Sequence, residues 1–143
     1  MRKIERSALV MYSDEQMYRL VNDIEAYPRF MEGCTGAEIL HRDEFSIEAR
    51  LHLGKAGIQQ TFVTRNRLEP PHTMHMALVE GPFSSFQGTW HFKTLNETAC
   101  KVSLSLEFEF QNKVLDLAAG KWFEAVANKQ VDSLCERAKV IYA

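Results

Sequence analysis

The C-terminal segment from residue 112 to residue 143 places the strongest constraint on the fold of this chain. Its apolar residues recur near helical spacing, while its charged and amide residues fall largely on other faces. The apolar set is Leu115, Ala119, Trp122, Val126, Leu134 and Ile141. One helix of this length would be a rod of roughly 45 Å, and the aromatic residues at its middle need a broad concave surface to bury them. The segment therefore predicts a single long amphipathic helix that packs against a curved sheet.

The residues before this helix form a nearly continuous series of predicted strands. Alternation is clearest over residues 45–53, where Phe45, Ile47, Ala49, Leu51 and Leu53 would face inward. Further strands are predicted at residues 4–12, 37–42, 58–68, 73–80, 86–95 and 99–110, with a hairpin tip at residues 54–57. This order indicates an α+β fold, in which a curved antiparallel sheet of about six to seven strands wraps around the long C-terminal helix.

A short helix is predicted directly after the first strand. Ser13 and Gln16 have the spacing of a capping box, in which each side chain binds the backbone N–H of the other residue. The apolar residues that follow, Met17, Leu20, Val21 and Ile24, lie at i, i+3, i+4 and i+7. A second short helix is predicted over residues 26–31, with Pro28 in its first turn.

The totals are those of an ordinary globular protein. A chain of 143 residues predicts one domain that spans residues 1–143. The formal net charge of −2 gives no overall attraction to nucleic acid or to an anionic membrane. Three widely spaced cysteines argue against a disulfide framework and against a zinc site. With no predicted membrane span and no signal peptide, we expect a cytoplasmic location.

The predicted inner face of the sheet is rich in large apolar side chains and contains three polar ones, Gln60, Thr64 and Asn66. They belong to the inward set of residues 58–68 when Leu53 lies opposite Ile58. Such a surface suits a large apolar ligand that a few polar groups orient. In the alternative interpretation, the polar groups bind nearby backbone and the aromatic residues only fill the core. The predicted pocket comprises Gln60, Phe62, Thr64, Asn66, Met76, Leu78, Phe83, Phe86, Trp90, Phe92, Leu106, Phe108, Trp122 and Val126.

Catalytic and metal-binding patterns are not evident in the sequence. His72 and His75 would lie on opposite faces of a strand, which is poor geometry for chelation. Glu107 and Glu109 share the strand face opposite the apolar residues, so we expect them to be solvated. The sequence contains no Gly-rich phosphate loop, nucleophile elbow or zinc motif. It therefore predicts no catalytic residue, no metal and no enzymatic activity.

The outer face of the central hairpin carries several cations, diluted by Glu48. Arg50, Lys55, Arg65 and Arg67 project to one side together with His52. One interpretation is an ordinary solvated strand face. The other is a docking patch for an anionic partner such as ribosomal RNA, which would be bound through its phosphates.

Several motifs resemble one family in order along nearly the whole chain. The segment from Tyr12 to Phe30 is similar to the start of bacterial relatives of the mitochondrial coenzyme Q-binding protein. The resemblance continues through Lys55-Ala56-Gly57-Ile58, Thr61-Phe62, Thr64-Arg65-Asn66, Leu78-Val79-Glu80-Gly81-Pro82-Phe83, Gly88, Trp90, Phe92, Ala99-Cys100-Lys101-Val102 and Phe108-Glu109-Phe110. This family belongs to the START-like, polyketide cyclase/dehydrase superfamily. Gly33-Cys34-Thr35-Gly36 and the hairpin motif most resemble its ribosome association toxins.

The resemblance implies a helix-grip fold with a cavity under the long helix, and two functions that are compatible with each other. One is binding of the large ribosomal subunit, which blocks its association with the small subunit. The other is binding of ubiquinone or another prenyl lipid in support of respiration, with no cofactor required. An antitoxin protein is a further candidate partner. A cyclase or dehydratase activity is the third, least supported reading, because no inner residue supplies its acid–base chemistry.

Overall fold

Seven antiparallel strands form one curved sheet in the computed structural model, which describes residues 1–55 and 57–142. The spatial order is β1-β7-β6-β5-β4-β3-β2, so the first strand closes the sheet beside the last one. The strands are β1 (Arg2–Val10), β2 (Cys34–Arg42), β3 (Ser46–Lys55), β4 (Ile58–Glu69), β5 (Thr73–Glu80), β6 (Phe83–Asn96) and β7 (Ala99–Phe110). The predicted α+β helix-grip class is confirmed.

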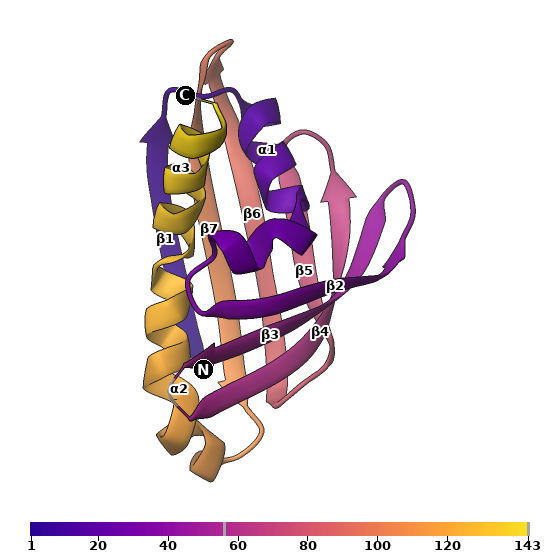
Figure 1. Cartoon of the computed structure of the whole chain (residues 1–143), viewed down its shortest axis with the longest axis vertical. Helices are drawn as coiled ribbons and strands as arrows, with labels where there is room; N and C mark the ends of the chain where they lie inside the picture. The colour runs from indigo at the N-terminus through magenta and orange to yellow at the C-terminus, as the bar shows by residue number, and fades with distance from the viewer. Residues whose placement is uncertain (56, 143) are drawn as a thin grey trace.

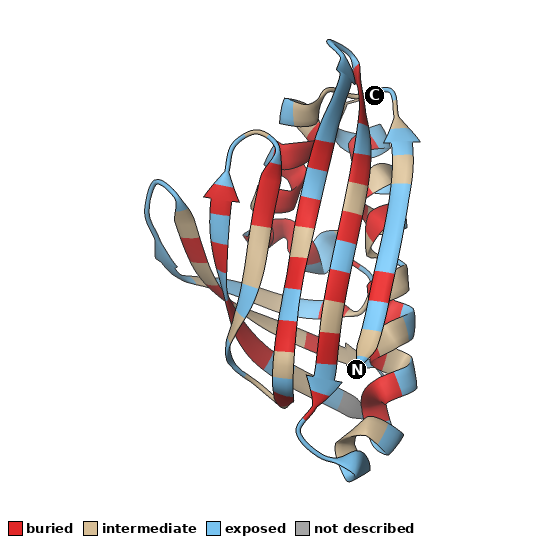
Figure 2. Ribbon diagram, turned by 180° about the vertical axis from the view of Figure 1, so that it is seen from behind, coloured by how far each residue is buried: buried red, intermediate tan, exposed pale blue. Residues whose placement is uncertain are grey.

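All helices of the described chain lie on one face of this sheet (Figure 1). They are α1 (Asp14–Asn22), the 3-10 helix η1 (Ile24–Arg29), α2 (Lys113–Asn128) and α3 (Gln130–Ile141). Figure 2 shows the uncovered outer face, where buried and exposed residues alternate along β6 and β7. The sheet therefore has one face that packs against helices and one face that is open to solvent.

The capping box predicted at the start of α1 is present. Ser13 Oγ accepts from the Gln16 N–H at 3.1 Å, and the Gln16 carboxamide oxygen accepts from the Ser13 N–H at 2.9 Å. The second short helix differs from the prediction, since it is the 3-10 helix η1 and Pro28 lies near its end. Pro28 was predicted in the first turn of this helix, and that placement was wrong by about one turn.

The strand boundaries are close to prediction, and β5 and β7 match it. β1 begins and ends two residues earlier than predicted, and β6 begins at Phe83. Phe45 was wrongly placed on the inner face: it lies in the turn before β3 and is 57% exposed. Lys55, rather than Leu53, lies opposite Ile58. This shift of two residues leaves the inward set from Ile47 to Leu53 on its predicted face. Lys55 was wrongly placed on the outer face, because it lies two residues after Leu53 on β3 and so shares the face of Leu53. Within the predicted hairpin tip, Ala56 lies outside the described residues, as does the side chain of Ile58.

The long C-terminal helix is two helices, which corrects the prediction of one rod over residues 112–143. The break is at Lys129, between α2 and α3, while Ala143 lies outside the described residues. The Gln130 side chain causes it, because Nε2 donates to the Val126 carbonyl at 2.9 Å and to the Glu32 carbonyl at 3.1 Å. A side chain that occupies an i−4 carbonyl is a recognised cause of a helix break.

Aromatic rings fill much of the space between α2 and the sheet. Phe123 of α2 lies 4.8 Å from Phe108 and 5.2 Å from Phe83 between ring centroids, in edge-to-face arrangements. These geometries are the favoured ones for aromatic pairs. No helix of the described residues is long and apolar enough to cross a membrane.

Candidate functional site

A small apolar cavity lies between the inner face of the sheet, η1 and the junction of α2 with α3. Its volume is about 90 Å³. The lining residues are Ile24, Tyr27, Met31, Cys34, Ala49, Leu51, Leu53, Phe62, Thr64, Asn66, Met76, Phe86, Trp90, Leu104, Leu106, Phe123, Val126, Ala127 and Gln130. They come from both halves of the sheet and from the helices above it, so the cavity depends on the assembled fold.

Strand β4 supplies the polar part of the lining. Thr64 is 1% exposed and Asn66 is 4% exposed, because both side chains point inward between apolar neighbours. Asn66 Oδ1 has no hydrogen-bond partner among the described residues. A buried acceptor without a partner costs about 1–3 kcal/mol, so the Asn66 carboxamide is a group that a ligand could satisfy.

The wall formed by η1 and the start of β2 contains the two titratable groups of the lining. The Tyr27 hydroxyl donates to the Val21 carbonyl, and burial raises the pKa of Tyr27 far above its usual value. Burial also raises the pKa of the Cys34 thiol, which donates to the Gly36 carbonyl at 3.4 Å. Both groups are therefore neutral and protonated near pH 7.

The helical wall approaches the β2 end of the sheet unusually closely at Gly33. Its φ of +79° lies in the left-handed region, and a Cβ there would lie 3.0 Å from Val126 Cγ2. Glycine is thus required both by the backbone conformation and by contact with α2. This contact positions Val126 and Ala127 over the cavity.

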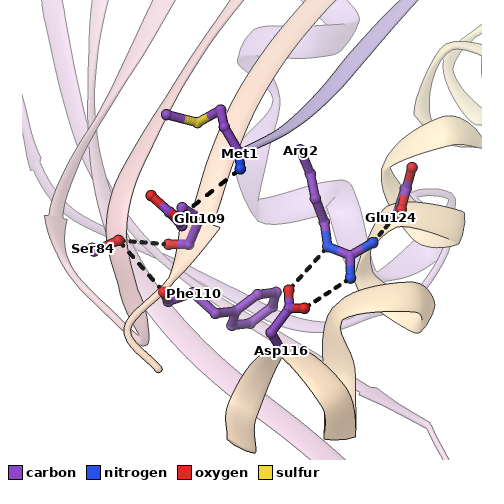
Figure 3. A network of polar contacts seen from close by, with 7 residues as sticks. All are labelled: Met1, Arg2, Ser84, Glu109, Phe110, Asp116 and Glu124. Atoms are coloured by element: carbon purple, nitrogen blue, oxygen red, sulfur yellow. Dashed lines mark hydrogen bonds and ion pairs between the residues drawn. The ribbon is translucent and has the colours of Figure 1, made fainter. Parts of the chain in front are cut away.

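Ion pairs attach the start of α2 to the edge strand β1 (Figure 3). The Arg2 guanidinium donates to both carboxylate oxygens of Asp116 at 3.1 Å and to Glu124 at 2.5 Å. Its hydrogen bond and charge hold the pKa of Asp116 below the usual value, and the carboxylates raise the pKa of Arg2. The network holds α2 against the sheet beside the cavity.

The cationic patch predicted on the outer face is partly neutralised. Arg50 lies 3.4 Å from Glu38, and Arg65 lies 2.8 Å from Glu48. Arg67 is exposed and has no ion-pair partner within the described part of the chain. Lys55 is also exposed and unpaired there, but it lies at the hairpin tip on the same face of β3 as Leu53. The patch is therefore less positive than its cation count alone suggests.

Comparison with known families identifies this arrangement. Residues 10–135 match the model of the polyketide cyclase/dehydrase and lipid transport family. The chain belongs to this family. It is 46% identical to the ribosome association toxin RatA of Vibrio cholerae over 99% of both chains. It is 45% identical to RatA of Escherichia coli, over 100% of this chain and 90% of that protein.

A more distant relative and two solved structures of similar fold differ in what they are named for. The mitochondrial coenzyme Q-binding protein COQ10 homologue B of Xenopus laevis is 24% identical over 95% of this chain and 57% of its own length. A Streptomyces aromatase/cyclase has the same fold, with a TM-score of 0.83 and 20% identity over 96% of this chain and 93% of that chain. A START superfamily protein of Mycobacterium smegmatis also has this fold, with a TM-score of 0.77 and 20% identity over 97% of this chain and 98% of that chain.

In this family member, eight of the fourteen residues predicted for the pocket line the cavity: Phe62, Thr64, Asn66, Met76, Phe86, Trp90, Leu106 and Val126. Six do not. Phe83, Phe92 and Phe108 are almost completely buried in the packed core, away from the void. Gln60, Leu78 and Trp122 are partly exposed and lie outside the lining.

Sequence reasoning missed most of the helical part of the lining and predicted only Val126 of α2. Phe123, rather than Trp122, is the aromatic residue of α2 that faces the cavity. Tyr27, Met31 and Cys34 enter through η1, the bend before β2 and the first residue of β2, where no periodic pattern indicates a face, whereas Ile24 ends the apolar series predicted for the first helix. The alternation of residues 45–53 had already placed Ala49, Leu51 and Leu53 inward. This alternation was the sequence signal that could have identified the β3 part of the lining.

Proposed function

We propose that this protein is a non-enzymatic toxin of the RatA type, which acts as a single START-like domain over residues 1–143. It binds the large (50S) ribosomal subunit and blocks its association with the small subunit into 70S. The observation that supports this most strongly is the 46% identity to RatA of Vibrio cholerae across 99% of both chains. Similarity at this level extends beyond what the shared fold alone produces, since the aromatase/cyclase with the same fold is 20% identical.

The outer face of the central hairpin is the proposed ribosome-facing surface, with Arg50, Arg65 and Arg67 as its cations and Lys55 beside it at the hairpin tip. Arg67 and Lys55 carry no ion pair in the described chain, and the Arg65 side chain is 64% exposed although it contacts Glu48. Arginine and lysine at such positions bind RNA through phosphates, and each contact makes binding more sensitive to salt.

Ribosome profiles test this proposal directly. We expect overexpression to decrease 70S particles, with the protein in the 50S fraction of a sucrose gradient. In Arg65→Glu/Arg67→Glu, binding should weaken by at least tenfold and the remaining binding should depend less steeply on salt concentration, because fewer phosphate contacts remain. Arg29→Glu, which changes an exposed arginine on η1, is the matched control and should bind normally.

An unchanged 70S peak with no protein in the 50S fraction would contradict the toxin function. Equal ribosome binding by the double variant would contradict only the assignment of the ribosome-facing surface.

The chemistry of the cavity supports a non-enzymatic role. Its described lining contains no carboxylate, imidazole, ammonium or guanidinium group. Tyr27 and Cys34 are its titratable groups, and burial shifts the pKa of each away from neutrality. General acid–base catalysis needs a group with a pKa near the working pH. A cyclase or dehydratase reaction would therefore have no proton carrier in this space.

Binding of ubiquinone or another prenyl lipid is the second candidate function. It is supported by the apolar lining, the unsatisfied Asn66 oxygen and the similarity to the coenzyme Q-binding protein. The volume of about 90 Å³ is smaller than the roughly 150 Å³ of an engineered cavity that binds benzene. A quinone would therefore bind only after the cavity widens. Mass spectrometry of lipid extracted from gently purified protein tests this function, and repeated recovery of ligand-free protein would count against it.

A further inference from the structure

Helix α2 has an exposed apolar face that no other part of the described chain covers. Its outer residues follow i, i+3, i+4, i+7 and i+11 spacing: Val114, Leu117, Ala118, Lys121 and Ala125. Val114 is 75% exposed and Leu117 is 86% exposed. The opposite face of the same helix is buried against the sheet through Ala119, Phe123 and Val126. A helix that is apolar on both faces normally has a partner on each of them.

The charges on α2 indicate what kind of partner the outer face would meet. Both of its acidic residues, Asp116 and Glu124, are ion-paired with Arg2 (Figure 3). Lys113 and Lys121 are exposed and have no ion-pair partner in the described residues. Three cations (Arg2, Lys113 and Lys121) thus stand against two carboxylates, which leaves a net charge of +1, and the two lysines are the unpaired cations beside the apolar residues. Lysine can extend its ammonium group beyond an apolar surface while its methylene chain stays in contact with that surface.

We propose that the outer face of α2 docks on an anionic lipid surface. Val114 and Leu117 insert at the level of the headgroups, and Lys113 and Lys121 contact the anionic lipids. This is binding along the membrane surface and needs no membrane-spanning segment. It would also place the cavity against the bilayer, because Phe123, Val126 and Ala127 on the inner face of α2 line that cavity.

Vesicle co-sedimentation of the purified full chain, without ribosomes, tests the proposal independently of the ribosomal function. The probes are vesicles of phosphatidylcholine alone and of phosphatidylcholine with phosphatidylglycerol at about 3:1. We expect binding to the mixed vesicles at physiological salt and weak binding to the neutral ones. Leu117→Glu should reduce binding to the mixed vesicles by at least tenfold. Lys113→Glu/Lys121→Glu should remove the preference for the mixed vesicles. Each lysine contact that is lost should weaken binding to these vesicles roughly fivefold.

Leu9→Glu is the matched control, because Leu9 is 72% exposed at the end of β1 and distant along the fold from the start of α2. It should bind vesicles like the wild type, and all variants should melt within a few degrees of it because the residues are exposed. Absence of wild-type binding to the anionic vesicles, or equal binding by Leu117→Glu, would overturn the proposal. A dimer in sedimentation velocity that Leu117→Glu dissociates would also overturn it, since a second copy would then cover this face.

Discussion

Phe123 and Trp122 are adjacent in sequence but lie in different environments. Phe123 is 3% exposed and contacts the rings of Phe83 and Phe108, whereas Trp122 is half-buried. We expect Phe123→Ala to decrease the free energy of unfolding by about 3–5 kcal/mol, because it removes a fully packed ring. Trp122→Ala should decrease it by roughly 1–2 kcal/mol. Chemical denaturation of both variants measures the difference, and an equal or reversed order would contradict the packing described.

Strand residues of the cavity were predictable from sequence, whereas of the helical residues only Val126 was predicted. Alternation places Phe62, Thr64 and Asn66 on one face whatever the exact register, because a strand has a period of two. In α2, apolar residues occur on nearly every face, so the period alone does not distinguish the buried side from the exposed one. The helical period is therefore compatible with Trp122 facing inward, and it is the contact of Phe123 with Phe83 and Phe108 that fixes the buried side.

At the level of elements, two contacts distant in sequence determine where the C-terminal helices lie. Gln130 breaks the helix through the carbonyls of Val126 and Glu32, and Arg2 attaches α2 to β1. Capping and strand alternation are local signals, so α1 and the strands were predicted closely. The break at Lys129 depends on a loop that lies about a hundred residues earlier in the chain, and no local pattern reports it.

The pairing of Asp116 with Arg2 predicts a dependence of stability on pH. Because the partner lowers the pKa of Asp116 in the folded state, the contribution to stability is complete above the unfolded pKa of about 3.9. It is lost as the pH falls through the lower folded value. Asp116→Asn should therefore melt a few degrees or less below wild type at pH 7, and the difference should vanish near pH 2.

Glu97→Gln, at the exposed tip between β6 and β7, is the control for this measurement and should follow the wild-type curve. Thermal melts across the pH range would contradict the role of the pair if Asp116→Asn matched wild type at pH 7. They would also contradict it if the difference between the two proteins grew as the pH fell.

At the level of the whole molecule, the two proposed surfaces lie on different sides of the sheet. Arg50, Arg65 and Arg67 alternate along β3 and β4 with the inward-facing residues, so they lie on the outer face, and α2 covers the inner face (Figure 1). The fold therefore allows ribosome binding and lipid binding to be changed separately. Outer-face residues such as Arg67 take no part in the cavity lining, and Leu117 takes no part in the hairpin.

This separation gives a prediction with reciprocal variants. Leu117→Glu should lose vesicle binding by at least tenfold and keep wild-type association with the 50S subunit. Arg65→Glu/Arg67→Glu should lose ribosome association and keep vesicle binding within about twofold, because its charges lie away from α2. Both measurements use the same purified proteins, with gradient centrifugation for the ribosome and co-sedimentation for the vesicles. If Leu117→Glu also loses the ribosome, α2 belongs to the ribosomal contact. The outer sheet face would then not suffice to explain binding.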